Sequence, residues 1–261
     1  MNDEEITIIK LNKDLRALVE SMTVDEARFL VDSYHITQEQ RMRLAAQIRS
    51  AKEEPHDVLE WSMKNSATLE TQIKTALRYF AESRHMGRWA MEVRGIGPVI
   101  ASGLIAHIDI TKAPTVGHIW AFAGLDPTRK WEKGKKRPWN TPLKTLCCMH
   151  IGECFVRTGN HPDSVYGKVY QQRKVLEQQR NDEGLFKEQA AAGAERVGKK
   201  TEAHKFYAKG KLPPGHIHAR ARRYAVKLFL SHWHAEAYRD HFKVEPPLPY
   251  PIAILGHAHV I

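Results

Sequence analysis

The feature that most constrains the fold is a two-glycine corner between two apolar segments. Trp89 and Val93 end the first apolar segment, and the chain then runs through Arg94-Gly95-Ile96-Gly97-Pro98 into the second, residues 99–106. Glycines at two positions allow a turn too tight for side chains. Proline is tolerated in the first turn of a helix because its missing N–H would have no partner there. We therefore predict two helices joined by a tight hairpin, with Ile96 filling the gap between them.

This corner resembles a helix-hairpin-helix motif, a small DNA-binding unit of repair and recombination proteins. Its amides lie near a helix N-terminus, where backbone N–H groups and the helix dipole favour an anion. A DNA phosphate bound there is positioned without its sequence being read. The candidate nucleic-acid-binding residues of the corner are Arg94, Gly95, Ile96, Gly97 and Val99. The alternative is an ordinary turn between helices, in which the glycines have no ligand.

The net charge of +10 is unevenly distributed along the 261 residues. Residues 1–60 hold 13 Asp/Glu and 8 Lys/Arg, so the remainder carries +15. A basic body with an acidic head indicates a polyanionic partner for the body. No apolar run approaches the ~20 residues of a membrane span, and the acidic start, Met1–Glu5, lacks the features of a signal peptide. We expect a cytoplasmic protein, associated with the nucleoid or present in phage-infected bacterial cytoplasm.

Helical patterns dominate the N-terminal third. Apolar residues recur at helical spacing over 3–22. Thr23 and Thr37 each precede Glu or Gln by three residues, a capping-box signature that predicts short helices from near 24 and 38. A longer helix is expected after Pro55, with a stripe at Leu69, Ile73, Leu77 and Phe80.

We therefore predict an all-α fold in four parts. An acidic helical region covers 1–86, and a domain built around the hairpin covers 87–157. An inserted polar helical arm covers 158–211. A basic terminal helix and an extended tail, 212–261, complete the core.

Residues 128–144 form the most basic segment, and Gly134, Pro138 and Pro142 mark it as a loop. Trp131 and Trp139 are interleaved with the charges, an arrangement that suits a sugar–phosphate face or an unpaired base. The alternative is a solvated loop attached to the core by its tryptophans. The candidate binding residues are Arg129, Lys130, Lys133, Lys135, Lys136 and Arg137, and Lys144 follows them.

A wider resemblance covers residues 85–157, through Val93-Arg94-Gly95-Ile96-Gly97-Pro98 and Ala123-Gly124-Leu125-Asp126-Pro127. These landmarks resemble the C-terminal domain of DEDD-type insertion-sequence transposases and Piv-type invertases. That resemblance implies a helical, DNA-binding domain, and it resumes weakly over 212–235. Members of this family also carry an N-terminal RuvC-like domain with four acidic metal ligands, and nothing before residue 85 resembles it.

A second departure concerns the nucleophile. The family uses a serine soon after the Ala-Gly-Leu landmark, whereas this chain reads Thr128-Arg129-Lys130-Trp131-Glu132-Lys133-Gly134. Thr128 and Thr141 are the available hydroxyls, and the sequence indicates no neighbouring base to activate either. The resemblance therefore favours DNA binding without strand transfer.

The segment 164–210 is polar, with a thin apolar seam of Val165, Val169, Leu176 and Leu185. So polar a helix projects into solvent or pairs with another chain, which makes a homodimer through 164–210 one interpretation. On the following helix, after Leu212-Pro213-Pro214-Gly215, the cations Arg220, Arg223 and Lys227 share one face at i, i+3 and i+7 and form a second candidate phosphate surface.

We expect no metal and no cofactor. Cys147, His150 and Cys154 share a helix face, which suits either a zinc site or three buried side chains. Alternating histidines in extended chain point the same way and chelate a metal. The alternative metal ligands are accordingly His216, His218, His257 and His259, with His232/His234 as a helical pair.

Two function classes follow, with a third behind them. The favoured one is a double-stranded-DNA-binding protein of a phage or mobile element, with little sequence specificity and no catalytic residues. RNA remains an alternative partner, because phosphate contacts do not distinguish the two acids. The second is a diverged transposase, recombinase or nuclease component that needs a partner or metal. The third is an interaction adaptor using the acidic head and the polar arm.

Overall fold

The computed structural model describes residues 10–51 and 57–247. Every regular element in these ranges is helical, which confirms the predicted all-α class. The chain divides into two compact units, one formed by 1–92 with 96–109 and the other by 93–95 with 110–261. No helix of the described ranges combines the length and apolar character needed to cross a membrane.

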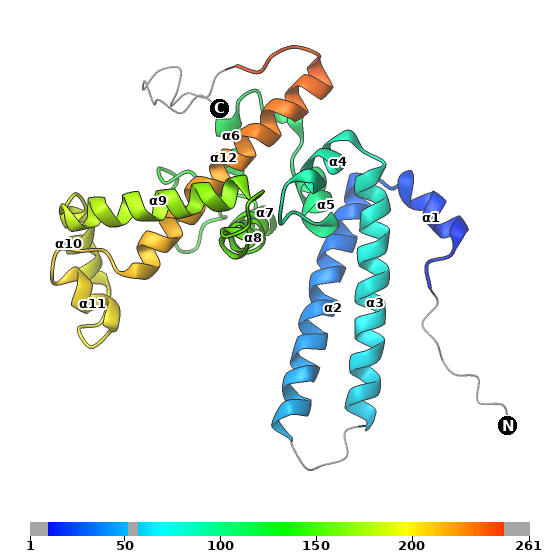
Figure 1. Ribbon diagram of the computed structural model, residues 1–261, viewed down its shortest axis with the longest axis horizontal. Coiled ribbons are helices and arrows are strands. Elements are labelled where there is room, and N and C mark those ends of the chain that lie inside the picture. The colour runs from blue at the N-terminus through cyan, green and yellow to red at the C-terminus, as the bar shows by residue number, and fades with distance from the viewer. Residues whose placement is uncertain (1–9, 52–56, 248–261) are drawn as a thin grey trace. The chain divides into compact units, whose positions relative to one another are not determined.

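The first unit is built on a long helical hairpin. Helices α2 (Val24–Ser50) and α3 (Asp57–Glu82) lie side by side (Figure 1). The shorter helices α1 (Lys13–Glu20), α4 (His85–Glu92) and α5 (Pro98–His107) pack at one end of this pair. Ile73, Leu77 and Phe80 of the predicted stripe are buried in its core, whereas Leu69 is exposed.

The capping-box prediction is confirmed at Thr23 and wrong at Thr37. Thr23 N–H donates to Glu26 Oε2 at 2.7 Å, and Thr23 Oγ1 accepts from the Glu26 amide at 3.2 Å. Thr37 lies inside an unbroken α2, where its hydroxyl donates to the Ser33 carbonyl at 2.8 Å. The helix continues because packing against α3 buries this face, and local capping chemistry is overridden by tertiary contact.

The second unit begins with the 3₁₀ turn η1 (Ile110–Lys112) and helix α6 (Val116–Phe122). After the basic loop comes the helix predicted over 143–157. It consists of α7 (Thr141–Thr145), the π-helical segment η2 (Leu146–Ile151) and α8 (Gly152–Thr158). The next helices are α9 (Val165–Asp182), α10 (Lys187–Arg196) and α11 (Glu202–Tyr207), and α12 (Pro214–Phe242) is the longest.

Helix α12 organises this unit, since α6, α8 and α9 all pack against it (Figure 1). Phe155 of α8, Tyr166 of α9 and Phe229 of α12 form an aromatic cluster with ring centroids 5.0–5.6 Å apart. The predicted inward face of this helix is confirmed, because Val226, Phe229, Leu230 and Trp233 are all buried.

The expectation that so polar a helix projects into solvent is wrong for α9, because this helix packs against α12. Val165, Leu176 and Leu185 are exposed, and the face turned to α12 carries Tyr166, Tyr170, Glu177 and Asn181 instead. Asn181 both accepts from the Leu212 amide at 2.8 Å and donates to the Leu212 carbonyl at 3.0 Å. The helix packs through polar groups because each finds a partner across the interface.

Candidate nucleic-acid interface

The two glycines of the corner differ in what they require. Gly95 has φ +98°, and a Cβ there would lie 3.3 Å from side-chain atoms of Cys154 and Thr158 on α8. Gly97 is extended, with φ −103°, and a Cβ there would meet no atom within 4 Å. The expectation that side chains do not fit is confirmed for Gly95 and wrong for Gly97.

The start of α5 is as predicted from Pro98. Gly97 is the N-cap and provides no side-chain hydrogen bond to the first turn, and Pro98 occupies that turn. The Val99 amide therefore belongs to the set that a helix leaves without an intrahelical partner. Ile96 and the Val99 side chain are buried, and Arg94 is exposed. Ile96 and Val99 thus contribute packing and backbone rather than exposed side chains.

The basic loop is exposed from Arg129 to Pro138. Lys135 Nζ pairs with Glu132 Oε2 at 2.7 Å, and the Arg129 guanidinium lies 3.9 Å from Asp126. Trp131 is 43% exposed, and its indole N–H donates to the Lys135 carbonyl at 2.6 Å.

Trp139 behaves differently from Trp131. It is half-buried against Gly124, and Lys144 Nζ lies 3.8 Å from its ring centroid. The Asn140 amide donates to the Phe122 carbonyl at 2.8 Å and ties the end of the loop to α6. One tryptophan therefore anchors the loop and the other stays at its surface.

The three predicted cations of α12 do not share one environment. The Arg220 guanidinium donates to Glu177 at 2.6 Å and lies over the Phe186 ring, so its charge is neutralised within the fold. Arg223 is exposed. Lys227 Nζ lies 4.0 Å from the Trp120 ring centroid, and burial lowers the pKa of this ammonium while the charge of Asp126 opposes the shift.

Asp126 joins the loop to α12. A hydrogen bond from the Thr128 amide, together with one from its hydroxyl, lowers the pKa of this carboxyl, and the charges of Arg129 and Lys227 act in the same direction. Lys144 and Arg223 both act on the Cys148 thiol, whose pKa is raised by burial. Lys144 and Arg223 thus lie near Cys148, and Arg129 and Lys227 lie near Asp126, whereas Arg220 is paired with Glu177.

Two residues that contact these cations were not singled out from the sequence. Trp120 of α6 donates its indole N–H to the Lys227 carbonyl at 3.1 Å and faces the Lys227 ammonium. Asp126 was noted only as part of a landmark. The partners lie about a hundred residues apart, and no local signal connects them. His118 and Phe122 of the same helix are exposed.

The alternating-histidine site is not formed by the described residues. His216 and His218 lie in α12, where positions i and i+2 diverge, and the expectation of extended chain is wrong there. His216 Nε2 is 3.2 Å from the Tyr207 hydroxyl, and His218 Nδ1 is 2.8 Å from the Tyr170 hydroxyl. His257 and His259 lie outside the described residues.

Of the cysteine face predicted over 147–154, Cys147 is buried, and His150 and Cys154 are half-buried. Burial raises the pKa of the Cys147 and Cys154 thiols and lowers that of His150. Within residues 10–51 and 57–247, no three His, Cys, Asp or Glu side chains are grouped so that they could hold a metal ion.

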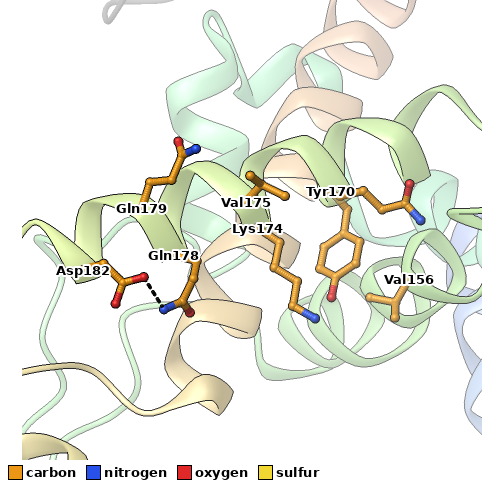
Figure 2. A pocket seen from close by; sticks show the side chains of 8 residues that line it. Val156, Tyr170, Lys174, Val175, Gln178, Gln179 and Asp182 are labelled. Atoms are coloured by element: carbon orange, nitrogen blue, oxygen red, sulfur yellow. Dashed lines mark hydrogen bonds between the residues drawn. The ribbon is translucent and has the colours of Figure 1, made fainter.

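A pocket of about 650 Å³ lies along α9 (Figure 2). Tyr170 and Lys174 line it, and Gln178 donates to Asp182 at 3.1 Å along its wall. Its lining contains one cation, Lys174, and one acid, Asp182. It lacks the excess of positive charge that a phosphate site needs.

Together these features define an all-helical protein whose exposed basic loop follows a two-glycine corner. Residues 67–140 match the family model described as the transposase IS116/IS110/IS902 family. No curated protein and no solved structure matches the chain. The chain thus contains a transposase-related region that runs from within α3 to the end of the basic loop.

The matched region differs in extent from the resemblance seen in the sequence. It begins at 67 rather than 85, so part of α3 in the N-terminal third is included, and it ends at 140 rather than 157. Both intervals contain the corner and the basic loop. The match therefore covers the corner and the exposed cations from Arg129 to Arg137, and it does not include the candidate residues of α12.

Proposed function

We propose that this protein binds double-stranded DNA of a phage or mobile element by its phosphate backbone, with little sequence specificity. The observation that carries the proposal is the segregation of charge between the two units. The unit of 93–95 and 110–261 holds 27 Lys/Arg against 13 Asp/Glu, a net +14, whereas the other unit carries −4. A local excess of this size favours a polyanion.

In this proposal the basic loop provides the main grip. Lys130, Lys133 and Lys136 are exposed. Arg223 of α12 adds an exposed cation, whereas Arg220 is paired with Glu177 and the Lys227 ammonium lies against the Trp120 ring. The helix-hairpin-helix contribution is the uncapped start of α5 at Gly97 and Val99, where a phosphate replaces the missing side-chain cap.

The test is a charge-removal variant, Lys130→Gln/Lys133→Gln/Lys136→Gln. We expect an affinity loss for duplex DNA of about tenfold or more at moderate salt, and a salt slope shallower by about 2 to 3, because each lost phosphate contact removes about 0.9 from it. Fluorescence anisotropy over a salt titration measures both. A matched control, Lys10→Gln/Lys13→Gln/Lys74→Gln, removes the same charge from exposed positions of the other unit.

Equal losses in the two triple variants would contradict the assignment of the interface to this loop. Absence of DNA affinity in wild-type protein at physiological salt would favour the interaction adaptor. If the protein bound a duplex RNA of the same sequence more tightly than the DNA, RNA would replace DNA as the proposed ligand.

The family match also favours a second candidate, a diverged transposase, recombinase or nuclease component. Thr128 Oγ1 donates to Asp126 Oδ1 at 2.8 Å, so this hydroxyl has a carboxylate neighbour that the sequence did not indicate. The lowered pKa of Asp126 makes it a weak base. Nicking of supercoiled or branched DNA in Mg²⁺ or Mn²⁺, abolished by Thr128→Val, would support catalysis over binding alone.

Apolar side chains left exposed on and after α9, among them Val165, Leu176 and Leu185, support the homodimer through 164–210. A dimer presents its basic surface twice to one duplex. Two linked contacts raise the overall affinity without any new contact type.

A further inference from the structure

We propose that Trp131 is a stacking platform for an unpaired DNA base, so that the preferred ligand is DNA with a gap, a branch or a single-stranded segment. This inference rests on the proposed function and names its substrate class. It starts from the position of Trp131 within the exposed basic loop, 129–138, where the ring is 43% exposed.

The ring is held by its own loop. The indole N–H donates to the Lys135 carbonyl at 2.6 Å, and the Lys135 amide donates to the Glu132 carbonyl at 3.1 Å. The Arg137 guanidinium carbon lies 5.5 Å from the ring centroid, within cation–π range, and Arg137 also reaches the Thr141 hydroxyl. A ring fixed in this way loses little conformational freedom when a ligand stacks on it.

These contacts define the ligand by exclusion. Because the indole N–H already has an acceptor, the ring offers no polar group, and its remaining surface is an apolar π-face. Six cations lie in the same exposed segment, 129–137, against the single acid Glu132. A fitting ligand is therefore planar and apolar over one face and anionic next to it, as a nucleotide is. An acidic peptide would supply the negative charge, but it would leave the face of the Trp131 ring without a stacking partner.

Base pairing decides between forms of DNA. In a continuous duplex the base faces are buried in the stack, and only unpaired, flipped or terminal bases present one. Trp139 provides the internal contrast, because its ring is half-buried against Gly124 and cannot receive a base.

The test compares two labelled DNAs of equal length, one fully paired and one with a central single-stranded gap. Trp131→Ala should lose about 5- to 100-fold in affinity for gapped DNA, the range for losing one stacked base, with less than twofold change on the duplex. Trp131→Phe should keep most of the gapped-DNA affinity. The matched control is Trp61→Ala, which removes a 60% exposed tryptophan from α3 in the other unit.

A second readout identifies the contact directly. A 5-iododeoxyuridine placed in the gap should crosslink on irradiation to the peptide that contains Trp131. Equal losses on both DNAs, no loss on gapped DNA, or a crosslink elsewhere would overturn the inference and leave duplex binding intact. Absence of binding to either DNA by wild-type protein at low salt would instead overturn the proposed function.

Discussion

At the scale of single residues, the most demanding position is Glu177, whose side chain is 1% exposed. It pairs with Arg173 at 2.5 Å and Arg220 at 2.6 Å, and Arg180 lies 3.8 Å away. Burial raises the pKa of this carboxyl, but the hydrogen bond from Arg220 and the charges of Arg220 and Arg173 outweigh it, and the net pKa is lowered. The carboxylate is therefore held ionised between α9 and α12.

We predict that Glu177→Gln destabilises the protein by about 2 to 4 kcal/mol. Breaking a buried ion pair leaves the charges of its partners uncompensated. The expected loss of stability is below the usual cost of breaking such a pair, because both arginines are partly exposed to solvent. Urea unfolding at pH 7 measures the difference. Glu183→Gln, an exposed acid just after α9, should change the stability by less than ~0.5 kcal/mol, and a similar loss there would contradict this account.

The sequence could not have identified this cluster. Glu177 lies among glutamines and arginines and looks like a solvated position, and its partner Arg220 is 43 residues away. For the same reason Arg220 was grouped with Arg223 and Lys227, since helical spacing gives the side of a helix and not what covers it. The six cations of the basic loop are exposed, as the sequence predicts, because loop composition alone indicates a surface position.

At the scale of elements, the junction of α3 and α4 depends on a close backbone approach. A Cβ at Gly87 would lie 2.1 Å from the carbonyl oxygen of Ala81, which is main chain and cannot rotate away. Gly87 is buried at the start of α4. The tight turn between α3 and α4 therefore requires glycine at position 87.

Gly87→Ala should cost about 3 kcal/mol, at the upper end for overpacking a rigid site. The comparison is Gly117→Ala in α6, where the new Cβ meets only the Thr115 hydroxyl at 3.5 Å. That variant should be neutral or more stable by up to ~1 kcal/mol, because alanine favours a helix over glycine. Thermal unfolding followed by circular dichroism distinguishes the pair, and equal melting temperatures would refute the steric argument.

Elements were predicted well where a local signal coincided with packing. The Thr23 cap, the Pro98 start of α5 and the Pro213-Pro214 start of α12 all follow from residues within one turn. The prediction failed at Thr37 and along α9, where the decisive partners are other helices. It also gave no hint of the π-helical segment η2, which has no compositional signature.

At the scale of the whole molecule, each unit contains a buried neutral histidine. Burial lowers the pKa of His107 in the first unit and of His234 in the second. His234 Nε2 donates to the Ala113 carbonyl at 2.8 Å. The folded protein therefore binds these protons less readily than the unfolded chain, whose histidines titrate near ~6.5.

The sign of the pH dependence follows. Since the unfolded chain takes up the extra protons, the stability contributed by the neutral histidines is complete above pH ~6.5 and is lost as the pH falls below it, by up to about 1.4 kcal/mol per pH unit for each one. The lowered carboxyl pKa values of Glu70 and Glu177 act only below pH ~4.5. Urea midpoints should fall between pH 7.5 and 5.5, and His234→Gln should flatten that slope. A midpoint that rises on acidification would contradict this prediction.

The path of the chain has a practical consequence for dissecting the protein. Residues 93–95 belong to the second unit, although the segments before and after them belong to the first. A fragment that starts at Ile110 keeps the basic loop and α12 but loses Gly95, which abuts Cys154 and Thr158 of α8. A fragment that stops at Asp109 retains residues 93–95 but lacks α8, which Gly95 abuts. No single cut separates the two units cleanly, so truncations and domain swaps need two junctions or an intact polypeptide.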